Sequence, residues 1–516
     1  MVSPKKASLS KPTKSTLKPV TTSAANKNFT ISISSPPLDS DKGIPFLSQN
    51  RQFQWTNTGN VILPVIPAYG ATALKQMGFK VYWDDAIAEK ISYQKWFHRL
   101  LKRRPKIIFI ETKTPVIKKH WQIINHIKKF LPRSIIALMG DHVTALPEES
   151  FSNSKVDYVI TGGDYDFMMI NLVKHLVHHT KLEPGFYYRS KVPKLQNTKV
   201  LNSGKFNLKH HHLDTLPIID RQLTKWQLYG QNNTNFKYKP GAYIMSGRDC
   251  WWGRCTFCSW TTTHPAGTFR TFSVDHTIKE IENLVSLGVR EIFDDSGTLP
   301  VGSWLTELCH QLIDKKLNQK IVLGCNMRFG ALNQDQYHLM KQAGFRFVLY
   351  GLESSNQKTL DRIHKNTKVA DAKKTLIMAK KAGLEPHLTI MIGYPWETKS
   401  DAFKTLNQAR QLFKDGLADS LQATIIIPYP GTPLFQQCLD NNWLLTDNWD
   451  NFDMRQPVMK SPFTDEEIKK IIRELFYGVL TPKFLLKKVT SIRNFDDIKF
   501  LSTYAIKYLK KLHDFS

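Results

Sequence analysis

Three of the six cysteines in this 516-residue chain, Cys250, Cys255 and Cys258, lie within nine residues of one another. Three thiolates on one loop offer soft ligands that suit an iron–sulfur cluster or a zinc ion. Zinc in a structural site takes four protein ligands, and because His264 is the next candidate along the chain, a Cys3His zinc loop stays open. Cysteines that only pack in a core rarely cluster so tightly, so the sequence predicts a metal centre held by these three residues.

The segment 246–258 (SGRDCWWGRCTFC) resembles the cluster loop of radical S-adenosylmethionine (SAM) enzymes, including an aromatic residue, Phe257, before the last cysteine. The common spacing is C-x3-C-x2-C, whereas this chain has C-x4-C-x2-C. The longer first gap, residues 251–254 (WWGR), resembles a variant found among cobalamin-associated members. The resemblance implies a [4Fe–4S] cluster whose open iron chelates SAM. It also implies one-electron cleavage of SAM to methionine and a 5′-deoxyadenosyl radical.

The residues around this loop alternate between strand and helix patterns over 241–433, which we expect to be a radical SAM core. The six predicted strands imply a partial (β/α)6 barrel with its chemistry at the carboxyl ends of the strands, and the cysteine loop follows the first of them. The predicted strands are 242–245, 289–293, 320–323, 345–350, 387–392 and 421–427. The resemblance implies that SAM is bound by residues after the other strands, namely Asp294, Asp295, Asn326, Arg328, Glu353, Ser354, Gly393 and Glu397.

A second α/β region is predicted upstream, over residues 31–180, as a Rossmann-like, doubly wound parallel sheet. Ligands of such sheets bind at the carboxyl ends of the strands. The region is similar to the cobalamin-binding domain that precedes many radical SAM cores. It lacks the Asp-x-His-x-x-Gly signature, so cobalamin would bind without that axial histidine; a Rossmann-like domain that binds nothing is the alternative. The resemblance implies cobalamin contacts at Asp84, Thr112, Gly140, His142, Thr144, Gly162 and Gly163.

The remaining segments carry weaker signals. Residues 1–30 are rich in Lys, Ser and Thr and predict a disordered basic tail, and residues 181–240 predict a connector. The stretch 434–516 predicts a mostly helical C-terminal region. Its last amphipathic helix, over 500–512, is basic; packing on the protein is favoured, and peripheral contact with a membrane is the alternative.

The composition excludes fewer possible functions than the motifs do. The formal net charge is +28, which is compatible with nucleic acid, an anionic membrane surface or a lysine-rich proteome. No transmembrane segment is evident, and six cysteines without a disulfide framework favour a reducing, cytoplasmic compartment. An RNA-modifying methylthiotransferase would carry a second cluster on N-terminal cysteines, yet none precedes Cys250. We therefore expect no nucleic-acid partner.

These features together predict a radical SAM enzyme with a [4Fe–4S] cluster, SAM and cobalamin. The favoured reaction is methyl transfer to an unactivated carbon. The alternatives are a cobalamin-associated cyclisation or rearrangement, and a non-catalytic iron–sulfur protein. We expect a small-molecule or lipid substrate and an external electron donor such as flavodoxin or ferredoxin. The sequence identifies no residue that touches the substrate.

Overall fold

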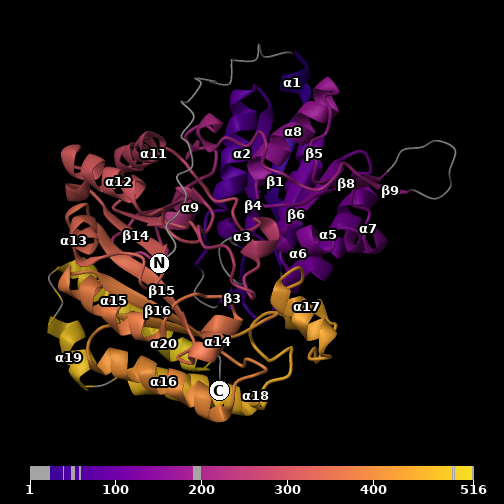
Figure 1. Ribbon diagram of the computed structural model, residues 1–516. Coiled ribbons are helices and arrows are strands. Elements are labelled where there is room, and N and C mark those ends of the chain that lie inside the picture. Colours follow the sequence, from indigo (N-terminus) through magenta and orange to yellow (C-terminus); the bar gives the residue numbers. More distant parts are fainter. Residues whose placement is uncertain are drawn as a thin grey trace.

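Two parallel sheets, each covered by helices, organise the chain, and a group of helices follows them (Figure 1). This computed structural model describes residues 24–38, 40–47, 53–56, 60–189, 199–480, 482–490, 492 and 494–513. Most of the predicted tail, residues 1–23, lies outside this range.

The N-terminal sheet has seven strands in the order β4-β1-β5-β6-β7-β8-β9, and the first five of these are parallel. The strand order reverses at β1, as in doubly wound folds, so the switch point lies between β1 and β5. The parallel strands are β1 (Thr30–Ser35), β4 (Lys80–Asp85), β5 (Ile107–Thr112), β6 (Ile135–Gly140) and β7 (Tyr158–Ile160). The predicted doubly wound sheet is confirmed.

Alternate residues of the buried strands supply the cores on the two faces of this sheet. Ile107 and Phe109 pack with helices α2 (Val65–Gln76) and α8 (Tyr165–His178). Ile108 and Ile110 pack on the other face, with α4 (Tyr93–Arg103) and α5 (Ile117–Phe130). Short helices α3 (Ala86–Glu89) and α6 (Asp141–Ala145) follow β4 and β6, and α7 (Glu149–Asn153) lies between α6 and β7.

The second sheet contains six parallel strands in chain order, β10-β13-β14-β15-β16-β17. The predicted partial barrel is therefore confirmed. Its strands are β10 (Gly241–Ile244), β13 (Glu291–Asp294), β14 (Val322–Met327), β15 (Phe345–Glu353), β16 (Glu385–Ile392) and β17 (Ser420–Ile425). The outer helices are α11 (Val274–Ser286), α12 (Ser303–Asp314), α13 (Gln334–Gln342), α14 (Gln357–Arg362), α15 (Val369–Lys381) and α16 (Lys399–Lys414).

Helices dominate the C-terminal region, as the sequence predicts (Figure 1, orange to yellow). They are α17 (Pro433–Asp440), α18 (Asp465–Val479), α19 (Pro482–Thr490) and α20 (Phe495–His513). Helix α18 begins at a capping box in which the Thr464 side chain accepts from the Glu467 amide. Within the described ranges, no helix has the length and the apolar character needed to cross a bilayer.

Several small elements differ from the sequence expectations. Residues 24–28, predicted to belong to a disordered tail, form helix α1 (Ala24–Asn28), where Asn26 donates to the Met77 carbonyl at 2.8 Å. The predicted connector includes β8 (Phe186–Arg189) and β9 (Val200–Asn202), which extend the N-terminal sheet by antiparallel pairing. The other short elements are β2 (Ile44–Phe46), β3 (Gln54–Thr56), α9 (Gln227–Gly230), β11 (Gly247–Arg248), α10 (Trp260–Thr263) and β12 (Arg270–Thr271).

Candidate functional site

The carboxyl ends of the two sheets meet along an interface that we call the seam. Gly163, after β7, lies so close to His264 that a Cβ atom on the glycine would be 2.0 Å from the imidazole Nε2. Gly431, after β17, lies close to α6, since a Cβ atom on this glycine would be 2.8 Å from Ala145 Cβ. Parallel sheets bind their ligands at these ends, so the seam brings two potential sites together.

The cysteine loop follows β10 on the core side of the seam, and the neighbouring strand ends hold it. Cys250 Sγ lies 3.2 Å from Thr298 Oγ1, in the segment after β13. The Thr256 amide donates to the Ile363 carbonyl at 3.0 Å, and Trp252 Nε1 donates to the His364 carbonyl at 2.7 Å. All six cysteines are free thiols, and the three outside this loop are buried. The loop is thus fixed while its thiols stay unlinked.

Two cations lie beside Cys255, although burial leaves the pKa of its thiol above the usual value. Burial raises the pKa of this thiol, while the charges of Lys365 and Arg328 lower it. The Arg328 guanidinium lies 5.4 Å and 4.6 Å from the ring centres of Trp251 and Trp252. Two residues of the gap between the first two cysteines therefore hold this cation against the loop by cation–π contacts.

The donor set of this loop fits an iron–sulfur cluster. Such clusters are held by cysteine thiolates, and the loop supplies three unlinked thiols with cations beside them. His264, the fourth ligand of the alternative zinc loop, has its Nε2 3.6 Å from Asp249 Oδ2, and burial lowers its pKa to about 3. Among the described residues, no group of three Cys, His, Asp or Glu side chains is placed to hold a single metal ion.

Two of the residues expected to contact SAM meet around Ser296. The Asp294 carboxylate accepts from Ser296 Oγ at 2.6 Å and from the Ser246 amide at 3.3 Å, and burial raises its pKa. Asn326 Nδ2 donates to the Ser296 carbonyl at 2.8 Å. Asp294 and Asn326 thus shape the turn beside the cysteine loop. Asp295 is buried next to them, and its amide donates to the Ile244 carbonyl at 2.8 Å.

The other expected SAM residues form two groups at the ends of β15 and β16. Glu353 lies in the left-handed region (φ 58°), and its Oε1 is 2.7 Å from Lys365 Nζ, which places it beside Cys255 and Arg328. Ser354 turns away from this group and donates to Glu397 Oε1 at 2.6 Å. Gly393, which precedes Glu397, has a φ of 100° that favours glycine.

Lys365 is a site residue that sequence reasoning misses. It is 8% exposed. In the sequence it lies between α14 and α15 and does not directly follow a strand. Burial disfavours its charged form, but the charges of Glu353 and Cys255 raise its pKa, so the ammonium group is retained. A lone lysine in a connecting segment carries no motif, and only the fold places it beside the cysteines.

The acids and hydroxyls predicted to contact cobalamin bond mainly within the N-terminal sheet and its helices. Asp84 forms ion pairs with Arg99 (3.0 Å) and Arg103 (2.5 Å) of α4. The Thr112 hydroxyl lies 2.7 Å from His120 Nδ1. Thr144 Oγ1 donates to the Gly140 carbonyl at 2.7 Å. These three side chains bond to other protein groups at the edge of the sheet.

His142 is also engaged with protein groups. Its Nε2 lies 2.9 Å from Glu149 Oε2, and its Nδ1 lies 3.2 Å from Thr114 Oγ1. Its ring packs edge-on against Trp449, with ring centres 5.3 Å apart. Both ring nitrogens therefore have protein partners.

The glycines of the N-terminal edge admit close approach by other parts of the protein. A Cβ on Gly140 would lie 2.1 Å from the Thr112 carbonyl oxygen, and one on Gly162 would lie 2.4 Å from the Phe206 ring. Gly163 makes the corresponding approach to His264. The resemblance implies cobalamin contacts at these glycines; in the structure, a backbone carbonyl and two side-chain rings pack against them.

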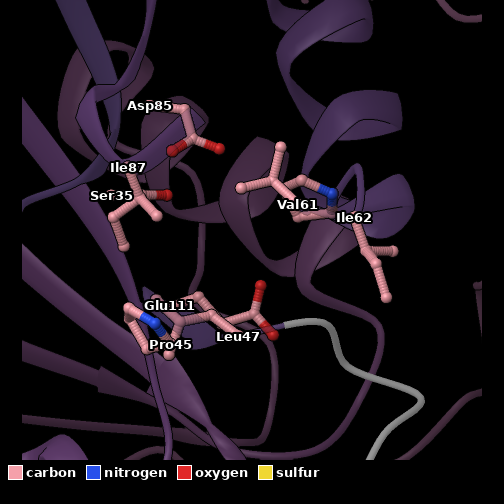
Figure 2. Close-up of a pocket in the computed structure, with 9 residues that line it drawn as sticks. Ser35, Pro45, Leu47, Val61, Ile62, Asp85, Ile87 and Glu111 are labelled. Atoms are coloured by element: carbon pink, nitrogen blue, oxygen red, sulfur yellow. The ribbon is translucent and has the colours of Figure 1, made fainter. Parts of the chain in front are cut away.

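A pocket opens at the ends of β1, β4 and β5, beside the switch point of the sheet (Figure 2). Figure 2 shows the carboxyl groups of Asp85 and Glu111 on its strand side, with Val61 and Ile62 across from them. Burial raises the pKa of Glu111 to about 8. Burial also raises the pKa of Asp85, which accepts from the Tyr229 hydroxyl at 2.6 Å. The lining is Ser35, Pro45, Leu47, Val61, Ile62, Pro64, Asp85, Ile87 and Glu111.

Buried ion pairs join the two sides of the seam next to the cysteines. Arg248, two residues before Cys250, is fully buried between Asp164 (3.2 Å) and Asp166 (2.6 Å), both from the segment after β7. Arg270 also pairs with Asp164 (2.9 Å). His211 lies between Asp164 (2.9 Å) and Glu183 (3.0 Å). Burial opposes protonation of His211, but its bonds to these two acids raise its pKa to about 9.

A second set of contacts closes the seam at the other end. Trp449, in the segment after α17, donates from Nε1 to Glu149 Oε1 at 2.8 Å. Asn448 accepts from Lys118 Nζ at 2.8 Å, and Asp453 pairs with Lys42 at 2.6 Å. The N-terminal sheet is therefore held both by the start of the core and by the segment that follows it.

The family comparison assigns the core. Residues 244–409 match the Radical SAM superfamily. The chain contains a radical SAM domain. The match begins at the end of β10 and includes the cysteine loop and the ends of β13 to β16. The predicted radical SAM core is thus confirmed, and the chain is an enzyme of this kind.

Relatives and a solved structure extend the comparison beyond the core of the enzyme. An uncharacterized methyltransferase of Pyrococcus horikoshii is 27% identical over 436 residues, which is 83% of this chain and 89% of the relative. An anaerobic magnesium-protoporphyrin IX monomethyl ester cyclase of Cereibacter sphaeroides is 24% identical, over 82% of this chain and 67% of the relative. The fold resembles the radical SAM methyltransferase TsrM of Kitasatospora setae, solved with cobalamin and a [4Fe–4S] cluster bound (TM-score 0.64, 12% identity, 89% and 90% of the two chains).

Proposed function

We propose that the enzyme binds a [4Fe–4S] cluster through Cys250, Cys255 and Cys258 and uses it to cleave SAM reductively. The observation that carries the proposal is three unlinked thiols on one loop, at the end of the first core strand, with Arg328 and Lys365 beside Cys255. When bound, the cluster supplies the electron that cleaves SAM. The protein holds the thiolates, keeps the loop in place and excludes water.

Charged groups around the thiols are suited to hold SAM. Its carboxylate can pair with a cation, and Arg328 is the one whose fork-shaped guanidinium recognises carboxylates best. Cation–π contacts with Trp251 and Trp252 hold the Arg328 guanidinium near the loop. Glu353 and its partner Lys365 are placed to accept and donate hydrogen bonds to the polar parts of the same ligand. Asp294 and Asn326 support the proposal indirectly, because they fix the Ser296 turn that borders this space.

For the second cofactor, we propose that cobalamin binds at the seam and that methyl transfer to an unactivated carbon follows. The doubly wound sheet faces the core with its carboxyl ends, where such sheets bind ligands. The apolar pocket beside the switch point offers space for part of a large ligand, with protonated Glu111 as a hydrogen-bond donor at neutral pH. The methyltransferase relative and the cobalamin-bound neighbour support the same reaction. The substrate would be a small molecule or a lipid, with flavodoxin or ferredoxin as an electron donor.

A second candidate reaction is a cyclisation that uses the same cofactors without net methyl transfer. The observation in its favour is the magnesium-protoporphyrin IX monomethyl ester cyclase, which matches 82% of this chain. The two reactions differ in the fate of the SAM methyl group. Methyl transfer consumes it, whereas cyclisation leaves it on methionine.

Anaerobically purified, reconstituted protein tests the proposal. We expect four iron and four sulfide per chain, a bound corrinoid, and release of 5′-deoxyadenosine on addition of SAM and dithionite. Deoxyadenosine without bound corrinoid would overturn the cobalamin assignment and leave the SAM cleavage intact. Bound zinc with no SAM cleavage would overturn both. SAM carrying a labelled methyl group separates the two reactions, because only methyl transfer makes the methyl acceptor radioactive.

A further inference from the structure

Exposed apolar side chains gather at the C-terminal end of the described chain. Thirteen large hydrophobic side chains are exposed among the described residues, and nine of them lie between residues 477 and 506. We call these nine the C-terminal apolar surface. Its members are Tyr477, Leu480, Leu485, Leu486, Val489, Ile492, Phe495, Ile498 and Ile506. Single exposed hydrophobic residues are ordinary, but such a concentration marks an interaction site.

Helix α19 has one face on the protein and one face toward solvent. Phe484 packs edge-on against Phe413 of α16, with ring centres 5.7 Å apart, and Lys488, one turn later, pairs with Asp419 at 3.2 Å. These contacts fix the inner face. Leu486 and Val489, which are 65% and 63% exposed, lie together with Leu485 at helical spacing on the opposite side.

Helix α20 repeats this arrangement and leaves its acids on the inner side. Asp496 pairs with Arg290 at 2.9 Å, and Asp497 pairs with Lys237 at 2.8 Å. Phe495 and Ile498 are 76% and 49% exposed. The segment 482–513 contains only these two acidic residues, against eight Lys and Arg. Arg290 and Lys237 pair with both acids, so the segment contributes an excess of positive charge by its composition, next to the exposed apolar side chains of α19 and α20.

We propose that the C-terminal apolar surface docks onto an anionic lipid bilayer, with α19 and α20 lying in the interface. Interfacial helices combine an apolar face with Lys and Arg, and binding grows with buried apolar area and with attraction to anionic lipids. A second copy of the chain would bring two positively charged surfaces together. A nucleic acid would use the charge but would leave the leucine, valine and phenylalanine side chains in water. The inference does not depend on the proposed chemistry.

Sedimentation of the full chain with lipid vesicles tests this proposal. We expect binding to vesicles of equal parts phosphatidylcholine and phosphatidylglycerol, weakening as salt is raised, and little binding to pure phosphatidylcholine. The double variant Leu486→Ser/Val489→Ser should partition at least about tenfold less, because it removes two inserted side chains. Leu445→Ser is the matched control, since Leu445 is 58% exposed but lies outside the surface; it should bind like the unaltered protein.

A charge variant and a measurement of association state complete the test. Lys499→Glu, at an exposed position of α20, should weaken binding to the anionic vesicles by several-fold while the apolar residues are intact. Equal binding to both vesicle types, or unchanged binding of the Leu486→Ser/Val489→Ser variant, would overturn the proposal. So would a dimer in analytical ultracentrifugation that this double variant dissociates, because the surface would then be an interface between copies of the chain.

Discussion

The two edges that meet at the seam are built in opposite ways. On the core edge, the charged side chains of Arg328, Lys365 and Glu353 converge on Cys255 from the ends of β14 and β15 and from the segment between α14 and α15. On the N-terminal edge, the polar side chains are mostly engaged with one another, as in the Asp84 pairs with α4 and the His142 contact with Glu149. The glycines there pack against other parts of the protein, and the pocket lined by Val61, Ile62 and Glu111 remains as the ligand-facing feature.

This difference teaches which kind of site a sequence can reveal. A site made of reactive side chains needs particular residue types at particular spacings, so it leaves a motif. A site made of backbone, small residues and apolar walls shares its composition with any doubly wound sheet. The cysteine loop of the core edge can therefore be predicted from its residues, while the N-terminal edge can be predicted only as a location.

Removal of a cluster ligand should have the largest effect, and only on the core edge. We expect Cys255→Ala to lower SAM cleavage by at least about a hundredfold, since the loop keeps two thiolates and loses the one beside the cations. Iron content, visible absorbance and 5′-deoxyadenosine release measure this. Cys438→Ala, a buried cysteine outside the loop, is the control and should retain iron and activity. Equal losses in the two variants would contradict the assignment.

Removal of the buried Arg248 side chain should weaken the contact between the two edges. Arg248→Met leaves Asp164 and Asp166 buried without their partner, and we expect the free energy of unfolding to fall by about 3–5 kcal/mol. Urea denaturation measures the change. The matched control is Arg290→Met, whose pair with Asp496 is partly exposed and should cost less than about 1 kcal/mol. A small cost at Arg248 would show that the ion pairs do not hold the seam.

The histidine in the same network gives a pH dependence. The folded state raises the pKa of His211 from 6.5 to about 9, so its stabilising effect is full below pH 6.5 and is lost as the pH rises through 9. We expect His211→Gln to lower the free energy of unfolding by about 2 kcal/mol at pH 6, less than the full shift implies because Glu183 is partly exposed. Denaturation at pH 6 and pH 10 should show the difference shrinking; a constant difference would argue against a charged His211.

A smaller effect should follow from a methyl group added at the seam. A Cβ on Gly163 would meet His264 Nε2, and because a side chain can shift, we expect Gly163→Ala to cost only about 1–2 kcal/mol. Thermal denaturation of the single variants and of Gly163→Ala/His264→Ala measures the coupling. The double variant should recover part of the loss from Gly163→Ala. If it does not, the close approach of these two residues is not what the substitution disturbs.

The parts of the fold that could be predicted are those that a short stretch of sequence determines. Strand and helix patterns predict all six core strands. The cysteine spacing indicated the cluster loop. Lys365, Glu111 and the Arg248 network were missed because their roles arise from contacts between distant segments: Arg248 is 84 residues from Asp164. No local pattern encodes such a meeting.

The closure of the seam at both ends has a practical consequence for preparing the protein. Arg248 fastens the N-terminal sheet to the start of the core, and Trp449 fastens it to the segment that follows. Contacts at both ends oppose opening of the seam, so we expect a ligand the size of a corrinoid to enter more readily while the polypeptide is still assembling. Expression in cells that take up corrinoid should therefore yield more loaded enzyme than incubation of the folded protein with the same corrinoid.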